Sequence, residues 1–215
     1  MATSTGQRVG IWVIAVAMIV GTLAGFFALI LTPENDAKDQ KRTEAALAAY
    51  QEDQAEYQKK VDAQAVELSK KYYDDFIAYK SVPATFNADA VTKLTTKDLQ
   101  KGTGKTIEKD TAYSAYYIGW NPAGKVFDQS IDGESLKAPI PGGNLIEGWN
   151  EGVIGMKIGG IRQITIPSDK AYGEEGSGED IPANTPLKFI VMVIESPKEI
   201  PQPEVPQELI EAYGQ

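Results

Sequence analysis

Two absences limit the residues that could carry chemistry in this chain. Its 215 residues include no cysteine and no histidine, which excludes a thiol nucleophile, a Ser–His triad, an imidazole base, a zinc finger and a structural disulfide. No two carboxylates stand in an apolar context that would separate their pKa values for acid–base catalysis. Any chemistry must therefore use single carboxylates, hydroxyls, amides or the shape of a pocket.

Two polar loops have the composition of ligand sites without the required spacing. The segment Lys101–Thr106 (KGTGKT) ends like a phosphate-binding loop, but Leu99 stands where the first glycine of that motif is needed. The acidic loop 174–180 (EEGSGED) does not have the spacing of a twelve-residue calcium loop. We interpret the first as a turn and the second as a solvated loop, and we predict no metal and no other cofactor.

Composition and charge narrow the class of protein further. Hydrophobic residues make up 42% and charged residues 24% of the chain, which is typical of one globular domain with appendages. Thirty acidic against 21 basic residues give a net charge of −9. A chain of this charge has no basic face for a phosphate backbone, so nucleic acid is excluded as the main partner.

Short runs of aromatic and aliphatic residues interleaved with glycine dominate the second half of the chain. The runs are Tyr117–Gly119 (YIG), Gly124–Asp128 (GKVFD), Leu145–Gly152 (LIEGWNEG), Ala171–Gly173 (AYG) and Ile181–Phe189 (IPANTPLKF). In this order and spacing they resemble the FK506-binding-protein (FKBP) family of peptidyl-prolyl cis–trans isomerases, over about residues 98–196. The resemblance implies an α+β fold, in which a twisted antiparallel β-sheet wraps around one short helix, and an enzyme that rotates prolyl peptide bonds.

The resemblance also implies a role for individual residues. The catalytic residues that it implies are Phe127, Asp128, Trp149 and Tyr172. The substrate-binding residues that it implies are Tyr117, Leu136, Leu145, Ile146, Ala171, Ile181 and Phe189. Trp149 would form the floor of an aromatic pocket, the Tyr172 hydroxyl would bind the substrate carbonyl, and the Ile146 amide would donate to the substrate backbone. A single buried aromatic residue is typical of a core, but several motifs in register favour a site.

Some positions depart from the family pattern. Leu136 and Ala138 stand where aromatic side chains are common, Asp180 replaces a frequent apolar residue, and Ser177 replaces a frequent histidine. The alternatives to an efficient isomerase are a chaperone module that binds proline-containing segments with little catalysis, and an assembly scaffold.

The pattern of apolar runs in the sequence predicts the strands and the helix that would position these residues. Strands are predicted at Thr111–Gly119, Lys125–Ser130, Ile161–Pro167 and Leu187–Ile194, and a short helix at Leu145–Val153. Glycine, proline, asparagine and aspartate separate these runs. Several strands with one short helix predict an antiparallel α+β domain at residues 95–197, after a linker at 81–94.

The N-terminal region predicts a membrane anchor. After a flank at residues 1–8, the run Val9–Leu31 holds 23 residues without a charge, which would span ~34 Å as a helix and cross a ~30 Å hydrocarbon core. A cleaved signal peptide is the rival, but the run exceeds the usual apolar region and no small-x-small site follows it. The basic residues after the span favour an inside C-terminus, yet long domains translocate regardless of loop charge, so we expect a single-pass protein of the cell membrane with an extracytoplasmic C-terminal domain.

A long helical stalk is predicted at residues 32–80, and a proline-rich acidic tail, extended and exposed, at 198–215. Seven stalk residues have the spacing of a weak coiled-coil seam: Leu47, Tyr50, Gln54, Tyr57, Val61, Gln64 and Leu68. This seam, together with the small residues of Gly21–Gly25, suggests a homodimer, with a solvated monomeric stalk as the alternative. The sequence thus predicts a membrane-anchored prolyl isomerase that acts on proline-containing polypeptide clients outside the cytoplasm.

Overall fold

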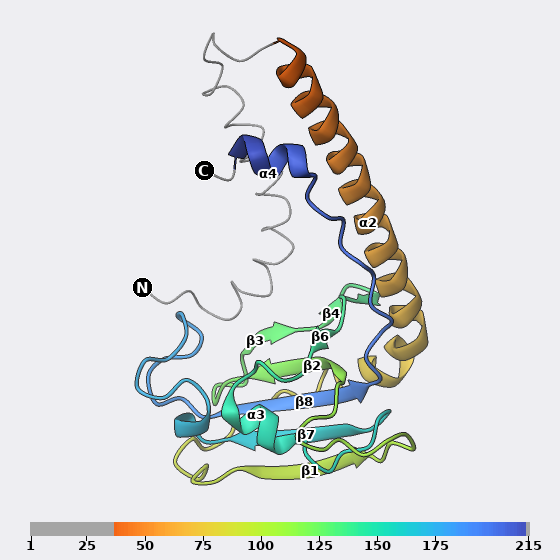
Figure 1. The fold of residues 1–215 in the computed structure, drawn as a ribbon. Helices are drawn as coiled ribbons and strands as arrows, with labels where there is room; N and C mark the ends of the chain where they lie inside the picture. The colour runs from red at the N-terminus through yellow and green to blue at the C-terminus, as the bar shows by residue number, and fades with distance from the viewer. Residues whose placement is uncertain (1–36, 214–215) are drawn as a thin grey trace. The chain divides into compact units, whose positions relative to one another are not determined.

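A computed structural model of the chain describes residues 37–213, and these divide into two compact units. Among the described residues, one unit holds 64–198 and the other holds 37–63 with 199–213. The larger unit contains an antiparallel sheet and a short helix, preceded along the chain by a long helix (Figure 1). The expected α+β class, an antiparallel sheet with one short helix after a long helix, is confirmed.

The strands of the larger unit form a six-stranded antiparallel sheet among the described residues. Its order is β1-β7-β8-β2-β3, and β6 pairs with β2 off this path. The strands are β1 (Thr95–Gln100), β2 (Ser114–Trp120), β3 (Val126–Gln129), β6 (Ile140–Pro141), β7 (Ile161–Ile166) and β8 (Leu187–Ile194). The hairpin β4 (Ile131–Asp132) and β5 (Ser135–Leu136) forms a separate two-stranded sheet.

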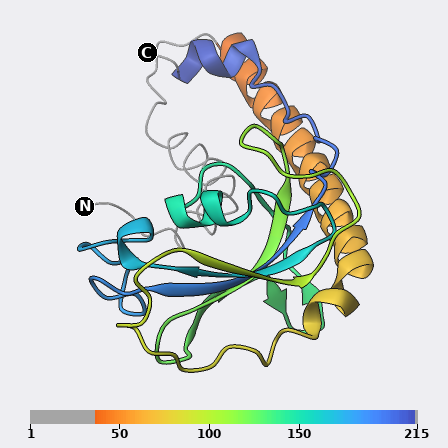
Figure 2. The same ribbon diagram turned by 90° about the horizontal axis from the view of Figure 1, so that it is seen from below.

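Apolar residues cover both faces of the central strands. All seven residues of β2 are buried, and successive side chains of a strand point to opposite faces. Ala115 and Tyr117 pack in one cluster with β7, β8 and the short helix α3 (Glu147–Gly152), whereas Tyr116 and Ile118 pack in a second cluster with Phe76. The sheet therefore lies between α3 on one face and the last turns of the long helix on the other (Figure 2).

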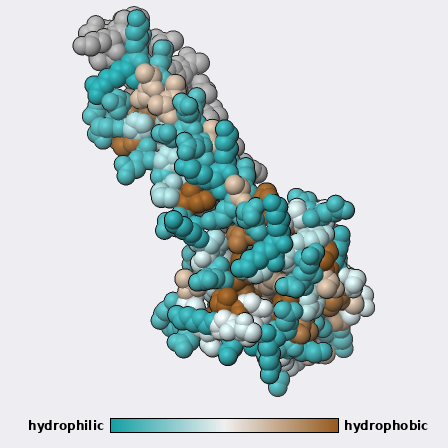
Figure 3. Space-filling model, turned by 90° about the vertical axis from the view of Figure 1, so that its right-hand side faces the viewer, coloured by the Kyte–Doolittle hydropathy of each residue, from teal (hydrophilic) through white to brown (hydrophobic). Residues whose placement is uncertain are grey.

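The long helix α2 (Ala37–Ile77) confirms that a long helix precedes the sheet along the chain. Its sequence is rich in good helix formers, and it includes an ion pair between Lys60 and Glu56 at 2.7 Å, one turn apart. The aromatic residues Tyr72 and Phe76 pack in the second hydrophobic cluster, against the sheet. Hydrophilic side chains cover much of the helix in the view of Figure 3, with small separate apolar patches.

The last two residues of the predicted seam are engaged within the larger unit. Leu68 packs against the cluster that contains Phe76. The Gln64 side-chain amide donates to the carbonyl of Lys198 at 2.8 Å. These two side chains therefore make contacts within the chain itself. The coiled-coil seam available for a dimer is correspondingly shorter than the spacing suggested.

The C-terminal tail contains a helix that was not predicted. α4 (Gln207–Tyr213) lies beside the first half of α2 within the smaller unit (Figures 1 and 2), and Glu208 pairs with Arg42 at 2.9 Å. Leu209 is only 2% exposed. The prediction of an extended, exposed tail was wrong over these residues, because Pro206 ends the proline-rich segment and its carbonyl accepts the amides of Leu209 and Ile210, the first turn of a helix.

The predicted anchor at Val9–Leu31 lies outside the described residues. Between residues 37 and 213, none of the helices has the length and apolar character needed to cross a bilayer.

Candidate active site

Four aromatic rings meet between α3 and the sheet. Trp149 of α3 lies edge-on to Tyr117 of β2, with ring centroids 5.6 Å apart, and to Phe189 of β8, at 5.2 Å. Phe127 of β3 contacts Phe189 in the same edge-on manner at 5.6 Å. Trp149 and Tyr117 are buried, and Phe127 is half-buried. These four rings, hereafter the aromatic cluster, are enclosed except on the side of β3, the open side, where Phe127 and Asp128 are half-buried.

A glycine on β2 leaves room for two of these rings. Gly119 pairs with Phe189 across the β2–β8 ladder. A Cβ atom at Gly119 would lie 2.6 Å from the Phe189 ring and 2.7 Å from the Phe127 ring, closer than van der Waals contact allows. The glycine of the YIG motif is therefore required by the packing of the cluster.

Two further glycines bring α3 close to the sheet. Gly148 and Gly152 lie one turn apart on the helix, and a Cβ atom on either would meet a β7 side chain: Ile166 at 2.3 Å and Ile164 at 2.6 Å. A larger residue at these positions would push the helix off β7. The glycine spacing in the EGWNEG segment thus sets the depth at which Trp149 enters the cluster.

A buried arginine holds the C-terminal end of α3. Arg162 of β7 donates from Nη1 to the carbonyls of Gly152 at 2.9 Å and Ile154 at 3.0 Å, and from Nε to Asp98 of β1 at 2.6 Å. Carbonyls at a helix C-terminus lack intrahelical partners and carry partial negative charge. The guanidinium therefore satisfies this end of the helix and ties it to the sheet edge.

A hydroxyl and a carboxylate meet at the open side of the aromatic cluster. The Tyr117 hydroxyl donates a short hydrogen bond to Oδ2 of Asp128, and the Gln129 amide donates to Oδ1 at 2.8 Å. Burial is the main reason that the pKa of Tyr117 lies well above its ordinary value, and the negative charge of Asp128 raises it further. Tyr117 thus remains a hydrogen-bond donor at neutral pH.

The predicted rim residues lie against the same cluster. Leu145, Ile146, Ala171 and Tyr172 are half-buried and pack against the hydrophobic core that contains Trp149, Tyr117 and Phe189, and Ile181 is buried in the same core. Ile146 is the N-cap residue of α3. Within residues 37–213 its amide donates to no acceptor, so this N–H remains available to a ligand.

One predicted substrate-binding residue lies elsewhere. Leu136 is buried in the second cluster with Phe76, on the other face of the sheet. Its amide donates to the Ser69 hydroxyl of α2 at 2.8 Å, and it pairs with Ile131 in the β4–β5 hairpin. The prediction that Leu136 lines the pocket disagrees with this placement, because α2, which the resemblance does not cover, provides a different surface for the hairpin.

The loop that follows Tyr172 is fastened to the β2–β3 turn. The Asn121 side-chain amide donates to the carbonyl of Asp180 at 2.9 Å, and Lys125 forms a close ion pair with the Asp180 carboxylate. The Ser177 amide donates to the Ile181 carbonyl at 2.7 Å, which closes the loop on itself. Asp180, a departure from the family pattern, therefore fixes the loop whose neighbour Ile181 enters the cluster.

Sequence reasoning missed Tyr113. The Trp149 indole N–H donates to the Tyr113 hydroxyl at 3.3 Å, and the pKa of Tyr113 is raised by burial. Tyr113, Ala115 and Tyr117 alternate along the strand region, and this period of two could have placed Tyr113 on the face toward α3. Arg162 was missed because a charged residue inside an apolar strand carries no signal of its partner.

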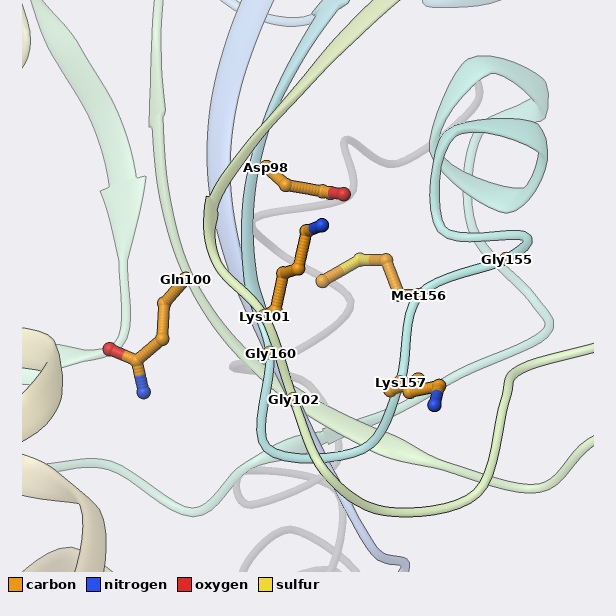
Figure 4. A pocket seen from close by; sticks show the side chains of 8 residues that line it. All are labelled: Asp98, Gln100, Lys101, Gly102, Gly155, Met156, Lys157 and Gly160. Carbon is orange, nitrogen blue, oxygen red and sulfur yellow. The ribbon is translucent and has the colours of Figure 1, made fainter.

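A pocket of about 340 Å³ lies between the KGTGKT segment and the loop 155–160. Figure 4 shows Asp98, Lys101 and Met156 pointing into the same space, while Gln100 and Lys157 point away. A Cβ atom at Gly102 would lie 2.2 Å from the Lys157 carbonyl, so the first glycine allows close packing against this loop. The structure shows this segment as irregular backbone with a bend at Gly104, and Thr106 forms an isolated bridge with Lys157.

Comparisons with known proteins identify the family. Residues 103–194 match the family model described as FKBP-type peptidyl-prolyl cis-trans isomerase. The FK506-binding protein of Neisseria meningitidis serogroup B is 41% identical over 102 residues, which cover 47% of this chain and 94% of that protein. A probable FK506-binding protein of Corynebacterium glutamicum is 41% identical over 103 residues, covering 47% and 85%.

Among solved structures, a peptidyl-prolyl cis-trans isomerase from Pseudomonas syringae aligns with a TM-score of 0.42 and 28% identity, over 60% of this chain and 91% of that one. From the family model and the two sequence relatives, the chain belongs to the FKBP-type peptidyl-prolyl cis-trans isomerases, and it is an enzyme of that type.

Proposed function

We propose that this isomerase turns prolyl bonds in the aromatic cluster, by non-covalent stabilisation of the twisted amide. The observation that carries the proposal is the set of edge-on contacts among Trp149, Tyr117, Phe189 and Phe127, with the Tyr117–Asp128 hydrogen bond at its open side. An apolar surface of this kind suits a proline ring, and its polar groups stand only at the edge.

The physical chemistry of the reaction explains why no nucleophile is needed. Resonance gives the peptide C–N bond double-bond character, and rotation about it faces a barrier of ~18–20 kcal/mol. The twisted amide has lost this resonance and is less dipolar, so a site that removes water from the carbonyl favours it over the planar ground state. No bond forms or breaks apart from the change in C–N bond order.

The rim groups supply the hydrogen bonds that hold the substrate backbone. The free Ile146 amide at the start of α3 suits a substrate carbonyl, and the Tyr172 hydroxyl suits a second one. Asp128 accepts the hydrogen bond of the Tyr117 hydroxyl and so orients the hydroxyl of Tyr117. These few fixed contacts keep the flanking chain in place while the prolyl bond rotates.

The test compares catalysis with simple binding. The full-length chain, in a mild detergent, should accelerate cis–trans exchange of an Ala-Leu-Pro-Phe peptide measured by NMR. Tyr172→Phe with Phe127→Ala should remove most of the acceleration, whereas Tyr79→Phe with Phe86→Ala, both from the second cluster, is the matched control. Suppression of aggregation of a denatured protein without acceleration would instead assign the chain to the proline-binding chaperones.

We further propose that residues 9–31 anchor the enzyme as a single-pass protein of the cell membrane, with the isomerase domain outside the cytoplasm acting on proteins that fold there. The support is the length of the uncharged run. The intact chain should stay in the membrane pellet after high-salt and alkaline washes. A mature N-terminus near residue 32 in cells would contradict an uncleaved anchor.

We also propose that the chain forms a parallel homodimer through the coiled-coil seam from Leu47 to Val61. Cysteines introduced singly at Leu47 and Val61 should crosslink, whereas cysteines at Glu52 and Lys59 should not. The chain has no cysteine of its own to interfere. Equal crosslinking at all four positions, or none at any, would favour a monomeric stalk.

A further inference from the structure

A second cavity, of about 830 Å³, lies along the face of α3 that bears Glu147, Asn150 and Glu151. Its other walls come from the loop 107–113 that precedes β2 and from Gly142, Gly143 and Leu145. Gly148 and Gly152 turn toward β7 and Trp149 toward the aromatic cluster. The cavity therefore uses a side of α3 that the proposed isomerase site leaves free, and its volume is in the range of ligand sites.

The cavity combines apolar walls with an acidic rim. Its apolar lining comes from Ile107, Tyr113, Leu145, Val153 and Ile154. Ile154 is 45% exposed, one of the few large apolar side chains exposed among the described residues. The charged lining residues are Glu108, Lys109, Asp110, Glu147 and Glu151, four acids against one base. Lys170 pairs with both helix glutamates, which leaves Glu108 and Asp110 as the less compensated acids.

An unpaired hydrogen-bond acceptor lies at this cavity. The Asn150 side chain donates from Nδ2 to the Leu145 carbonyl at 2.9 Å, whereas its Oδ1 atom is buried and has no hydrogen-bond partner. The Leu145 carbonyl can only accept, so it fixes which end of the Asn150 amide faces it. Oδ1 is thus a buried acceptor without a partner in the described fold, and buried polar atoms of this kind are rare in proteins.

Two residues connect the cavity to the aromatic cluster. Tyr113 lines the cavity, and its hydroxyl accepts the Trp149 indole N–H at 3.3 Å. Leu145 lines the cavity and packs against the cluster that contains Trp149. An occupant in contact with Leu145 is thus next to the proposed path of the substrate chain.

We propose that this cavity is a second binding site of the enzyme, which holds a basic-apolar segment of the client polypeptide next to the proline being isomerised. An apolar side chain packs against the exposed Ile154, and a lysine or arginine meets the exposed acids Asp110 and Glu108. The proposal rests on the isomerase function proposed above and adds a selection among clients to it.

The test measures a preference for the segment next to the proline. Peptides share one Leu-Pro core and carry a six-residue flank of alternating Lys-Leu, Glu-Leu or Gly-Ser, on either side in separate series; the flankless tetrapeptide is the reference. With the full-length chain in mild detergent, we expect kcat/KM for the Lys-Leu flank to exceed that for the Glu-Leu flank by about five- to tenfold at low ionic strength, and the ratio to fall with salt.

Two variants report on the cavity, and one serves as control. Asp110→Asn with Glu108→Gln removes the two less compensated charges of the rim, and Ala112→Phe narrows the cavity at an exposed lining residue without changing its charge. Each should bring the flank ratio close to one. Asp132→Asn with Glu134→Gln, in the β4–β5 hairpin, makes the same charge change on exposed residues outside the cavity and should keep the ratio. A wild-type ratio near one, or a ratio that both cavity variants retain, would overturn the proposal.

A proline-free Lys-Leu peptide separates this proposal from the isomerase function. It should shift the Trp149 indole N–H resonance, assigned with Trp149→Phe, and the shift should be absent in Ala112→Phe. If the chain fails to accelerate the flankless tetrapeptide but shows this shift, the proposed catalysis is wrong and the second site stands. If it accelerates the tetrapeptide and the peptide causes no shift, the second site is wrong.

Discussion

The indole N–H of Trp149 donates to the hydroxyl of Tyr113, which lies just ahead of β2, at 3.3 Å. Both side chains are buried, so the hydrogen bond fixes the orientation of the ring that forms the floor of the aromatic cluster. The same strand region carries Tyr117, two pleats along, whose ring lies edge-on to the same Trp149 ring, with centroids 5.6 Å apart.

Tyr113→Phe should destabilise the protein. The substitution keeps the ring but leaves the Trp149 N–H buried without an acceptor, which costs about 1–3 kcal/mol in the free energy of unfolding. Urea unfolding followed by tryptophan fluorescence measures the change. Tyr79→Phe, also in the larger unit, is the control and should lie within ~0.5 kcal/mol of wild type. Equal stability of Tyr113→Phe and wild type would mean that water replaces the hydroxyl.

The catalysed rate should be independent of pH between about 6 and 9. Burial raises the pKa of the Tyr117 hydroxyl above its ordinary value of 10.0, so this hydroxyl keeps its proton over the whole range, and the chain has no histidine that could titrate there. A bell-shaped kcat/KM profile for the tetrapeptide would contradict the proposed non-covalent mechanism.

The contribution of Tyr117 to the free energy of unfolding, unlike the catalysed rate, should depend on pH and decrease at high pH. Because its pKa is raised in the folded state, the contribution is fully present below pH ~10, where unfolded tyrosines keep their protons, and it is lost as the pH rises above that value. Unfolding curves at pH 9 and 11 should therefore converge between wild type and Tyr117→Phe. A stability difference that widens at high pH would reverse the assigned direction.

Gly148→Ala and Gly152→Ala should each destabilise the fold and lower activity. The added methyl groups meet Ile166 and Ile164 at 2.3 and 2.6 Å, and relief of such overpacking typically costs 1–3 kcal/mol, roughly, with movement of the helix. Glu151→Ala on the same helix is the control, because its exposed ion pair with Lys170 contributes little. If alanine at both glycines stabilised the protein through helix propensity alone, the close approach of α3 to β7 would be incorrect.

Arg162→Met should be strongly destabilising. It would leave the Gly152 and Ile154 carbonyls without their donor, and an unsatisfied buried acceptor typically costs about 1–3 kcal/mol. The loss of the ion pair adds little, because the Asp98 side chain is 43% exposed and solvent screens it. The midpoint of thermal unfolding should fall by several degrees, whereas Lys97→Met on the exposed strand β1 should leave it nearly unchanged. Similar midpoints for the two variants would contradict the role of Arg162 at the end of α3.

Much of the fold could be predicted because its signals are local. The near-continuous apolar and aromatic runs of β2 and β8 and the glycine-bounded helix around Trp149 marked the central elements to within a few residues. β1 was missed because its sequence, TTKDLQ, lies at the sheet edge with five of its six residues exposed and has no apolar alternation. α4 was missed because the prolines before it dominate the composition of the tail.

The site residues that lie in local motifs could also be predicted, whereas those whose positions depend on distant parts of the chain could not. The side chains around Trp149 follow from motifs that lie close together on adjacent strands, and the structure brings them into one cluster. Leu136 could not be placed from sequence, because its position depends on Ser69, 67 residues earlier in the chain. The second cavity and the orphan oxygen of Asn150 depend on the loop before β2 and on α3 together, and no local pattern in the sequence indicates such a pair.

The most direct test of the central claim locates the proline ring on the enzyme. Intermolecular NOEs should be measured between the full-length chain in mild detergent and a peptide with an isotope-labelled Leu-Pro core. We expect NOEs from the proline ring protons to the rings of Trp149, Tyr117 and Phe189, together with a shift of the Ile146 amide. NOEs to Ile107 and Val153 instead, with none to Trp149, would contradict the assignment of the aromatic cluster as the prolyl site.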